Sequence, residues 1–300
     1  GEPSIKNVVF QIIENADTAI LALQNGEVDA YQMTPQQVKK LDLDASNLST
    51  YSYSEGRVGY LEINWNRVTD EKVRKALLYA MDRKAMDDAA FESSEYYSIP
   101  YTFLPTNSQF YTEDGVEKYE QDVDKAKSML EDAGVSGLKL KLGYMSSDAV
   151  QSAQALLIQE QLKEVGVTVE LAGGDGTAIA NAMKDPDNEY DMYLGGYIMG
   201  IDPDTFSSLF ENDGAYNYMH YSGYDTIDQL FEEGRSELDE SARKETYAKL
   251  QAAVQDTGAF YPIISNNKIL VVNNRIQGVE DAGLVPVYTF EDTSSLKIAE

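Results

Sequence analysis

Carboxylates at two places in this sequence could do acid–base chemistry. Asp202 and Asp204 follow a glycine-containing segment, and Glu62 lies within a stretch of alternating side chains. Two carboxylates on either side of a sugar ring are the machinery of a glycoside hydrolase, in which one acid protonates the leaving oxygen. The chain contains 51 Asp and Glu residues, so a chance pair is also expected. A carboxylate-dependent glycoside hydrolase is therefore an alternative function and not the favoured one.

The sequence carries no stronger catalytic or metal-binding signal. Cysteine is absent and His220 is the single histidine, which excludes cysteine nucleophiles and zinc sites built from Cys and His. We interpret His220 as a packed or hydrogen-bonded ring. The segment 185–191 (DPDNEYD) resembles half of a calcium loop without the DxDxDG order, and we interpret it as a turn. We therefore expect no enzyme, no catalytic residue, no metal and no cofactor.

The charge of the chain limits its partners. There are 24 Lys and Arg residues against 51 Asp and Glu residues, which gives a net charge of −27. A field of this sign repels phosphate backbones, so we expect no nucleic-acid partner. No run approaches the roughly 20 apolar residues of a membrane span. We interpret the acidity as a well-solvated surface.

The segment 190–210 is the element around which a binding site would be built. It begins as an alternating apolar strand, contains Gly195, Gly196 and Gly200, and continues after Asp202 into a short helix. Glycine lets another chain approach the backbone closely. Such an edge could give main-chain hydrogen bonds to an extended ligand. An ordinary buried strand followed by a turn is the alternative.

A second strand, predicted over 58–65, places polar groups on one face. Tyr60, Glu62 and Asn64 alternate with Leu61 and Ile63, so the first three share a face. That face is either a wall that contacts a ligand or a surface that faces water.

The remaining pattern alternates strands with capped helices and predicts an α/β or α+β protein with a mixed sheet. We expect a buried strand over 6–13, a helix from Pro35 to about residue 43, and parallel strands over 138–144 and 167–171. Two further strands, over 260–265 and 268–272, would be joined by a turn at Asn266-Asn267. The other helices are expected over 18–24, 69–81, from 83, 122–133, 147–164, 177–183, 224–237 and 240–256.

Taken in order, several segments resemble one protein family. They are VGYLEINWN (58–66), DEKVRKALLYAMDRKAM (70–86), DVDKAKSMLEDAG (122–134), GGYIMGIDPDTFSSLF (195–210) and NYMHY (217–221). This ordered set is similar to the extracellular solute-binding proteins of ABC peptide importers, the oligopeptide- and dipeptide-binding type of family 5. The resemblance covers nearly the whole chain and implies that it is the C-terminal portion of a longer protein.

The resemblance implies a set of ligand-binding residues. Gly195 and Tyr197 match the strand whose main chain pairs with a bound peptide, and Gly196 falls where the family often has tryptophan. Met199 falls where typical members place an aspartate that pairs with the free amine of the peptide, which methionine cannot do. The ligand is then blocked, non-peptidic or anchored elsewhere. The other expected ligand-binding residues are Tyr60, Glu62, Asn64, Asp202 and Asn217.

The resemblance also implies an architecture and a function. The fold would be α/β with mixed sheets, in the two-lobe class II architecture of periplasmic binding proteins. Residues 58–263 would form a complete distal lobe, 1–57 part of the first lobe, and 264–300 the return into it. We expect a monomer that captures oligopeptides in a cleft between lobes and delivers them to a membrane permease. It would lie on the outer face of the cell membrane, lipid-anchored as a lipoprotein when full-length, or in the periplasm. A nickel chelate, an oligosaccharide or a signalling peptide are the alternative ligands.

Overall fold

The computed structural model describes residues 3–91, 93–198, 200, 202–220, 222, 225–286 and 288–299. The chain divides into two compact units, one of residues 56–265 and one that combines 1–55 with 266–300. Each unit is built from both helices and strands, so the expected α/β class is confirmed. Among the described residues, no helix combines the length and the apolar character needed to cross a membrane.

The unit of residues 56–265 is organised around a mixed sheet. Its strands lie in the order β8, β3, β7, β5, β6, with β3 antiparallel to both β8 and β7 and with β5 parallel to β6 and β7. The parallel pair predicted for the middle of the chain is thus confirmed. The strands of this unit are β3 (Arg57–Ile63), β4 (Tyr97–Ser98), β5 (Lys139–Met145), β6 (Thr168–Gly174), β7 (Met192–Ile198) and the first half of β8 (Phe260–Asn273).

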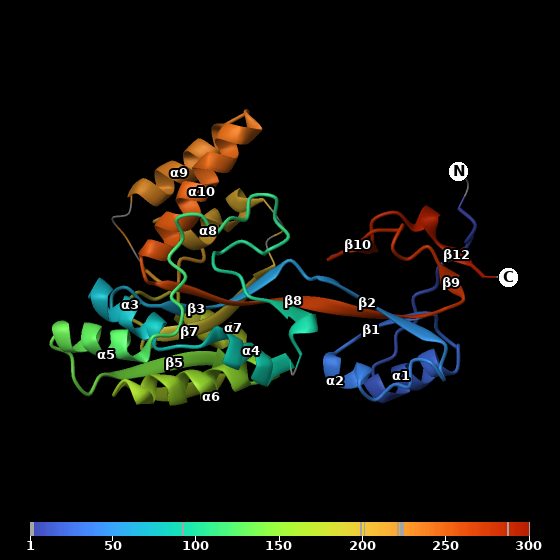
Figure 1. Ribbon diagram of the computed structural model, residues 1–300, viewed down its shortest axis with the longest axis horizontal. Coiled ribbons are helices and arrows are strands. Elements are labelled where there is room, and N and C mark those ends of the chain that lie inside the picture. The colour runs from blue at the N-terminus through green and yellow to red at the C-terminus, as the bar shows by residue number, and fades with distance from the viewer. Residues whose placement is uncertain are drawn as a thin grey trace. The chain divides into compact units, whose positions relative to one another are not determined.

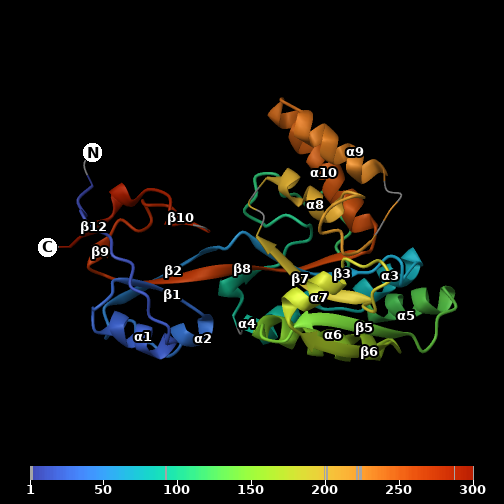
Figure 2. The same cartoon turned by 180° about the vertical axis from the view of Figure 1, so that it is seen from behind.

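Helices cover both faces of this sheet (Figures 1 and 2). The side chains of Leu61, Leu142 and Leu194 belong to a core that includes residues of α3 to α6, and Val58, Tyr60 and Phe260 belong to a second core with α8 to α10. The helices are α3 (Glu71–Tyr79), α4 (Arg83–Phe91), η1 (Ser94–Tyr96), α5 (Val123–Asp132), α6 (Ala149–Glu164), α7 (Gly176–Ala182), η2 (Pro203–Phe206), α8 (Ser207–Phe210), α9 (Asp225–Ser236) and α10 (Glu240–Asp256).

The helices begin where the sequence provides capping side chains. Asp122, Asp148 and Asp239 each accept a hydrogen bond from a backbone N–H in the first turn of α5, α6 and α10. These bonds satisfy amides that have no partner within the helix. The predicted helices of this unit are therefore confirmed, with ends that differ from the sequence-based ranges by a few residues.

Two buried arginines join the helix α3–α4 segment to the rest of the unit. The Arg74 guanidinium donates to the carbonyl oxygens of Val68, Thr69 and Thr257 and stacks 3.5 Å from the centre of the Trp65 ring. Arg83 donates to the carbonyl oxygens of Lys118, Tyr119 and Pro262 and lies over the Tyr261 ring. Planar guanidinium groups suit such multiple contacts. These two residues stabilise the fold.

The other unit contains a small antiparallel sheet. The second half of β8 lies between β1 (Ala30–Met33) and β2 (Leu48–Ser54) and pairs with both. Two short pairs follow, β10 with β11 and β9 with β12. The remaining elements are α1 (Ala16–Gln24), α2 (Pro35–Val38), β9 (Ile276–Gln277), β10 (Leu284–Val285), β11 (Thr289–Phe290), η3 (Thr293–Ser295) and β12 (Lys297–Ile298).

Three local predictions for this unit were wrong. The segment 6–13 is not a buried strand: Val9 is 84% and Phe10 91% exposed, because no described residue pairs with it and a strand needs a neighbour. Helix α2 ends at Val38 rather than near residue 43. Asn266-Asn267 is not a turn, since β8 runs continuously through it and Asn267 pairs with Ser54 of β2.

Candidate ligand-binding site

Strands β3 and β7 bring most of the sequence-predicted site residues together. In their antiparallel register Tyr60 lies opposite Gly195, Glu62 opposite Tyr193, and Val58 opposite Tyr197. Residues directly opposite each other share a face of the sheet. The side chains of Tyr60, Glu62 and Tyr197 therefore lie on one face, the face that carries the second core.

The opposite edge of β7 is only partly paired. Strand β5 pairs with β7 at Met192 and Tyr193, and no described strand continues that pairing along the rest of β7. The backbone from Leu194 to Ile198 thus presents an edge that includes both glycines. An edge of this kind accepts an added strand through main-chain hydrogen bonds.

Each glycine on β7 accommodates a large neighbour from β3. An ideal Cβ at Gly195 would lie 2.6 Å from Cε2 of Tyr60, and a Cβ at Gly196 would overlap the guanidinium of Arg57. Gly196 therefore leaves room for Arg57 at the position where the resemblance implies a tryptophan. Sequence reasoning missed Arg57, although two adjacent glycines in a strand are a signal that a bulky group crosses it.

Glu62 is fully buried, with an exposed fraction of 0%, and neither of its carboxylate oxygens has a hydrogen-bond partner among the described residues. Burial of an unpaired carboxylate disfavours the charged form. This desolvation raises the pKa of Glu62 to about 8. The face that holds Glu62 is therefore not a surface that faces water, and that alternative from the sequence was wrong.

Tyrosines surround this carboxyl group. Tyr193 packs edge-on against Tyr218 with ring centres 6.3 Å apart, and Tyr218 packs edge-on against Tyr216 at 6.1 Å. The ring of Tyr197 is tilted against that of Tyr216 at 5.4 Å. Burial, followed by the charge of Glu62, raises the pKa of Tyr193 to about 12 and the pKa of Tyr218 above its usual value. We call Tyr60, Tyr193, Tyr197, Tyr216 and Tyr218 the tyrosine cluster. Sequence reasoning named Tyr60 and Tyr197 as site residues and missed the other three.

Asn64 and Asn217 have structural partners of their own. The Asn64 amide donates to the carbonyl oxygen of Tyr190 at 3.2 Å and its side-chain oxygen accepts from the Asn66 amide, so it orders the turn after β3. Asn217 donates to the carbonyl oxygen of Glu211 and lies next to Tyr218 in a hollow that also contains His220. A ligand role for either residue stays a prediction.

Asp202 and Asp204 are both paired with arginines. Asp202 caps η2 by accepting from the Asp204 amide, and its two oxygens accept from Arg243 of α10 at 3.1 Å. Arg235 of α9 donates to Asp204 at 2.8 Å. These contacts leave no free carboxylate pair of the hydrolase type at this turn. Met199, the remaining predicted site residue, lies outside the described residues.

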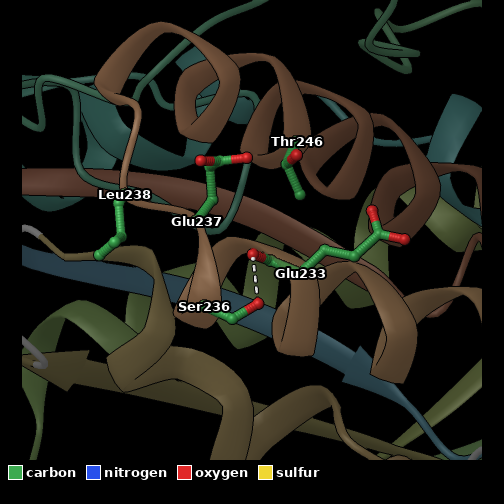
Figure 3. A pocket seen from close by; sticks show the side chains of 5 residues that line it. All are labelled: Glu233, Ser236, Glu237, Leu238 and Thr246. Carbon is green, nitrogen blue, oxygen red and sulfur yellow. Dashed lines mark hydrogen bonds between the residues drawn. The ribbon is translucent and has the colours of Figure 1, made fainter.

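A separate hollow lies at the junction of α9 and α10 (Figure 3). It is lined by Glu233, Ser236, Glu237, Leu238 and Thr246, and Ser236 donates to a backbone carbonyl of its own helix. The side chain of Leu238 is 98% exposed. None of the site residues predicted from sequence lines this hollow, so we do not assign the ligand site to it.

Comparison with known proteins identifies the class to which this fold and site belong. Residues 1–218 match the family described as "Bacterial extracellular solute-binding proteins, family 5 Middle". The chain belongs to this family. The resemblance seen in the sequence is thereby confirmed.

One solved structure is similar in fold, and two curated proteins are similar in sequence. The crystal structure of the ABC transporter substrate-binding protein CtaP of Listeria monocytogenes is 37% identical, with a TM-score of 0.90 over 97% of this chain and 60% of that chain. The oligopeptide-binding protein AppA of Bacillus subtilis is 25% identical over 91% of this chain and 53% of its own length. The nickel-binding periplasmic protein of Escherichia coli is 22% identical over 99% of this chain and 60% of its own. This chain thus spans little more than half of these relatives.

Proposed function

We propose that this protein is the substrate-binding component of an ABC importer and that it captures peptides. In this proposal residues 58–263 form a complete distal lobe, and residues 1–57 and 264–300 are parts of the other lobe. A monomer of the full-length protein closes around the peptide and delivers it to a membrane permease. It works outside the cytoplasmic membrane, either lipid-anchored or in the periplasm.

The single observation that carries the proposal is the incompletely paired edge of β7. From Leu194 to Ile198 its main chain is paired on one side by β3 and, among the described strands, by none on the other. A peptide added there gains affinity from backbone hydrogen bonds that do not depend on its sequence. The tyrosine cluster supplies aromatic walls for the side chains of the ligand. Such a site suits a receptor that accepts many peptides.

The other ligands have weaker support. A nickel chelate is suggested by a relative, but His220, the single histidine, is engaged with the carbonyl oxygen of Met183 at 2.6 Å. No group of three metal-ligating side chains converges within the described residues. The hydrolase alternative needs free acids, whereas Asp202 and Asp204 are held by arginines.

Calorimetric titration of the full-length protein tests the proposal. Tetra-alanine should release or absorb heat on binding, whereas a nickel–histidine complex and triacetylchitotriose should not. Tetra-alanine that is N-methylated at one central amide should bind about tenfold more weakly, because one main-chain donor is lost. Binding of the nickel complex or the sugar without binding of the peptide would overturn the proposal.

A further inference from the structure

Glu62 is a buried acid that the fold itself does not use. Both oxygens lack a hydrogen-bond partner among the described residues, and no positive charge there offsets the effect of burial on the pKa of Glu62. Arg74 and Arg83, which are also buried, donate instead to backbone carbonyls. An unpaired buried carboxyl lowers stability, so a structural role would be served better by an apolar residue of similar size.

The surroundings of Glu62 suit a positive charge. Tyr193 lies directly opposite it on β7, and Tyr60 is on the same face of β3. Through ring contacts Tyr193 is connected to Tyr218 and then to Tyr216, which is 39% exposed. The faces of aromatic rings attract ammonium and guanidinium groups, and the attraction grows when the cation is desolvated. A carboxylate next to several tyrosines therefore offers both a counter-charge and an aromatic enclosure.

We propose that Glu62 and the tyrosine cluster form a cation subsite, which takes an ammonium or guanidinium group of the ligand. This inference rests on the proposed function and adds the chemical class of the ligand: a peptide that carries a free amine or a basic side chain. The subsite replaces the anchor that Met199 cannot provide. Tyr193 and Tyr197 are half-buried and Tyr216 is exposed, so the ring contacts of the cluster extend from the neighbourhood of Glu62 to the surface.

Binding of a cation at this subsite displaces a proton. Burial raises the pKa of Glu62 to about 8, so the acid is mostly protonated at neutral pH, and it ionises when a cation lies next to it. The other titratable groups next to Glu62 are tyrosine hydroxyls of the cluster. The Arg57 guanidinium lies on the other face of β3 by register, and its charge acts on Tyr60 and Tyr193. Burial raises the pKa of Tyr60, Tyr193, Tyr197 and Tyr218 above the usual value of a tyrosine, which leaves Glu62 as the source of the proton.

The experiment compares two peptides on the full-length protein by calorimetry: tetra-alanine with a free amine, and N-acetyl-tetra-alanine. The wild-type protein should bind the free-amine peptide at least roughly 30-fold more tightly than the acetylated one. This ratio is near the low end of the gain in affinity that a buried charge pair gives. In Glu62→Gln this preference should disappear, while the acetylated peptide still binds. Asp87→Asn, which alters another buried and unpaired carboxyl group, should keep the preference.

Proton counting separates a binding role from a structural one. In two buffers of different ionisation enthalpy, the wild-type protein should release about one proton per free-amine peptide at neutral pH, and Glu62→Gln should release none. Equal affinity of the wild-type protein for the two peptides, or a preference that survives in Glu62→Gln, would overturn the cation subsite and leave peptide capture intact. Binding of neither peptide would contradict the proposed function and this inference together.

Discussion

The ring of Tyr60 on β3 lies directly against the main chain of Gly195, its cross-strand partner on β7. A Cβ at position 195 would approach Cε2 of the ring to 2.6 Å. Tyr60 in turn packs against Phe260 of β8 with ring centres 4.6 Å apart. The absence of a side chain at Gly195 on β7 thus leaves room for the rings of Tyr60 on β3 and Phe260 on β8, on the face that holds the candidate site.

Replacement Gly195→Ala should destabilise the protein by about 1–3 kcal/mol, because the added methyl group overpacks against Tyr60. Urea unfolding measures this change. Gly174→Ala is the matched control: its Cβ would meet Ile179 at 3.5 Å, an ordinary contact, so we expect a change within about 0.5 kcal/mol. If both variants were equally stable, the close approach of Tyr60 to Gly195 would not restrict the size of the side chain at position 195.

Stability should fall as the pH rises, because of Asp87. This residue of α4 is fully buried, and desolvation raises its pKa to about 8, although Arg83 acts in the opposite direction. The folded protein then keeps a proton that the unfolded chain releases above about pH 4. The contribution of Asp87 to the free energy of unfolding should therefore fall between about pH 4 and pH 8, by at most about 1.4 kcal/mol per pH unit.

Urea unfolding between about pH 5 and pH 8 tests this dependence. Asp87→Asn should flatten the curve, and the double variant with Glu62→Gln should flatten it further, since the pKa of Glu62 is also raised to about 8. Asp114→Asn, which changes an exposed acid, should leave the slope as it is in the wild-type protein. Parallel curves for the wild-type protein and Asp87→Asn would refute the role of Asp87.

Arg83→Lys should destabilise the protein by at least about 2 kcal/mol, although the charge is kept. The Arg83 guanidinium donates to the carbonyl oxygens of Pro262 and Lys118 at 2.7 and 2.6 Å while it stacks on Tyr261. A lysine cannot make this fork of contacts. Thermal or urea unfolding gives the difference in stability.

Arg235→Lys is the control for this substitution. Arg235 pairs with Asp204 and Glu211, but its side chain is 45% exposed, so the loss should stay below about 1 kcal/mol. Similar losses of stability for Arg83→Lys and Arg235→Lys would show that the buried hydrogen bonds of the Arg83 guanidinium do not stabilise the protein more than an exposed ion pair does.

The sequence predicted elements best where the determinants are local. Helices α5, α6 and α10 begin at Asp122, Asp148 and Asp239, because a capping carboxylate and an apolar stripe lie within a few residues. The strands of the site were also predicted, as was the short helix that follows Asp202. The motif that includes Arg74 and Arg83 was informative about the family, but its hydrogen bonds to Thr257 and Pro262 join residues far apart in the chain.

Tertiary contacts account for the errors. Asn266-Asn267 has the composition of a hairpin turn, but pairing of Asn267 with Ser54 keeps it extended, so context overrides propensity. Tyr60, Glu62 and Asn64 suggested a face that contacts water or a ligand, and packing of distant segments buries all three side chains. Tyr193, Tyr216 and Tyr218 were missed because their proximity to Glu62 depends on the register of β3 and β7 and on the loop after α8.

Native mass spectrometry of the full-length protein, purified without denaturation, tests the central claim most directly. A receptor that pairs with the main chain of its ligand should carry a mixture of peptides from the expression host. We therefore predict a ladder of bound masses that match short peptides of varied sequence. A single discrete mass of a metal chelate or a sugar would contradict peptide capture at the β7 edge.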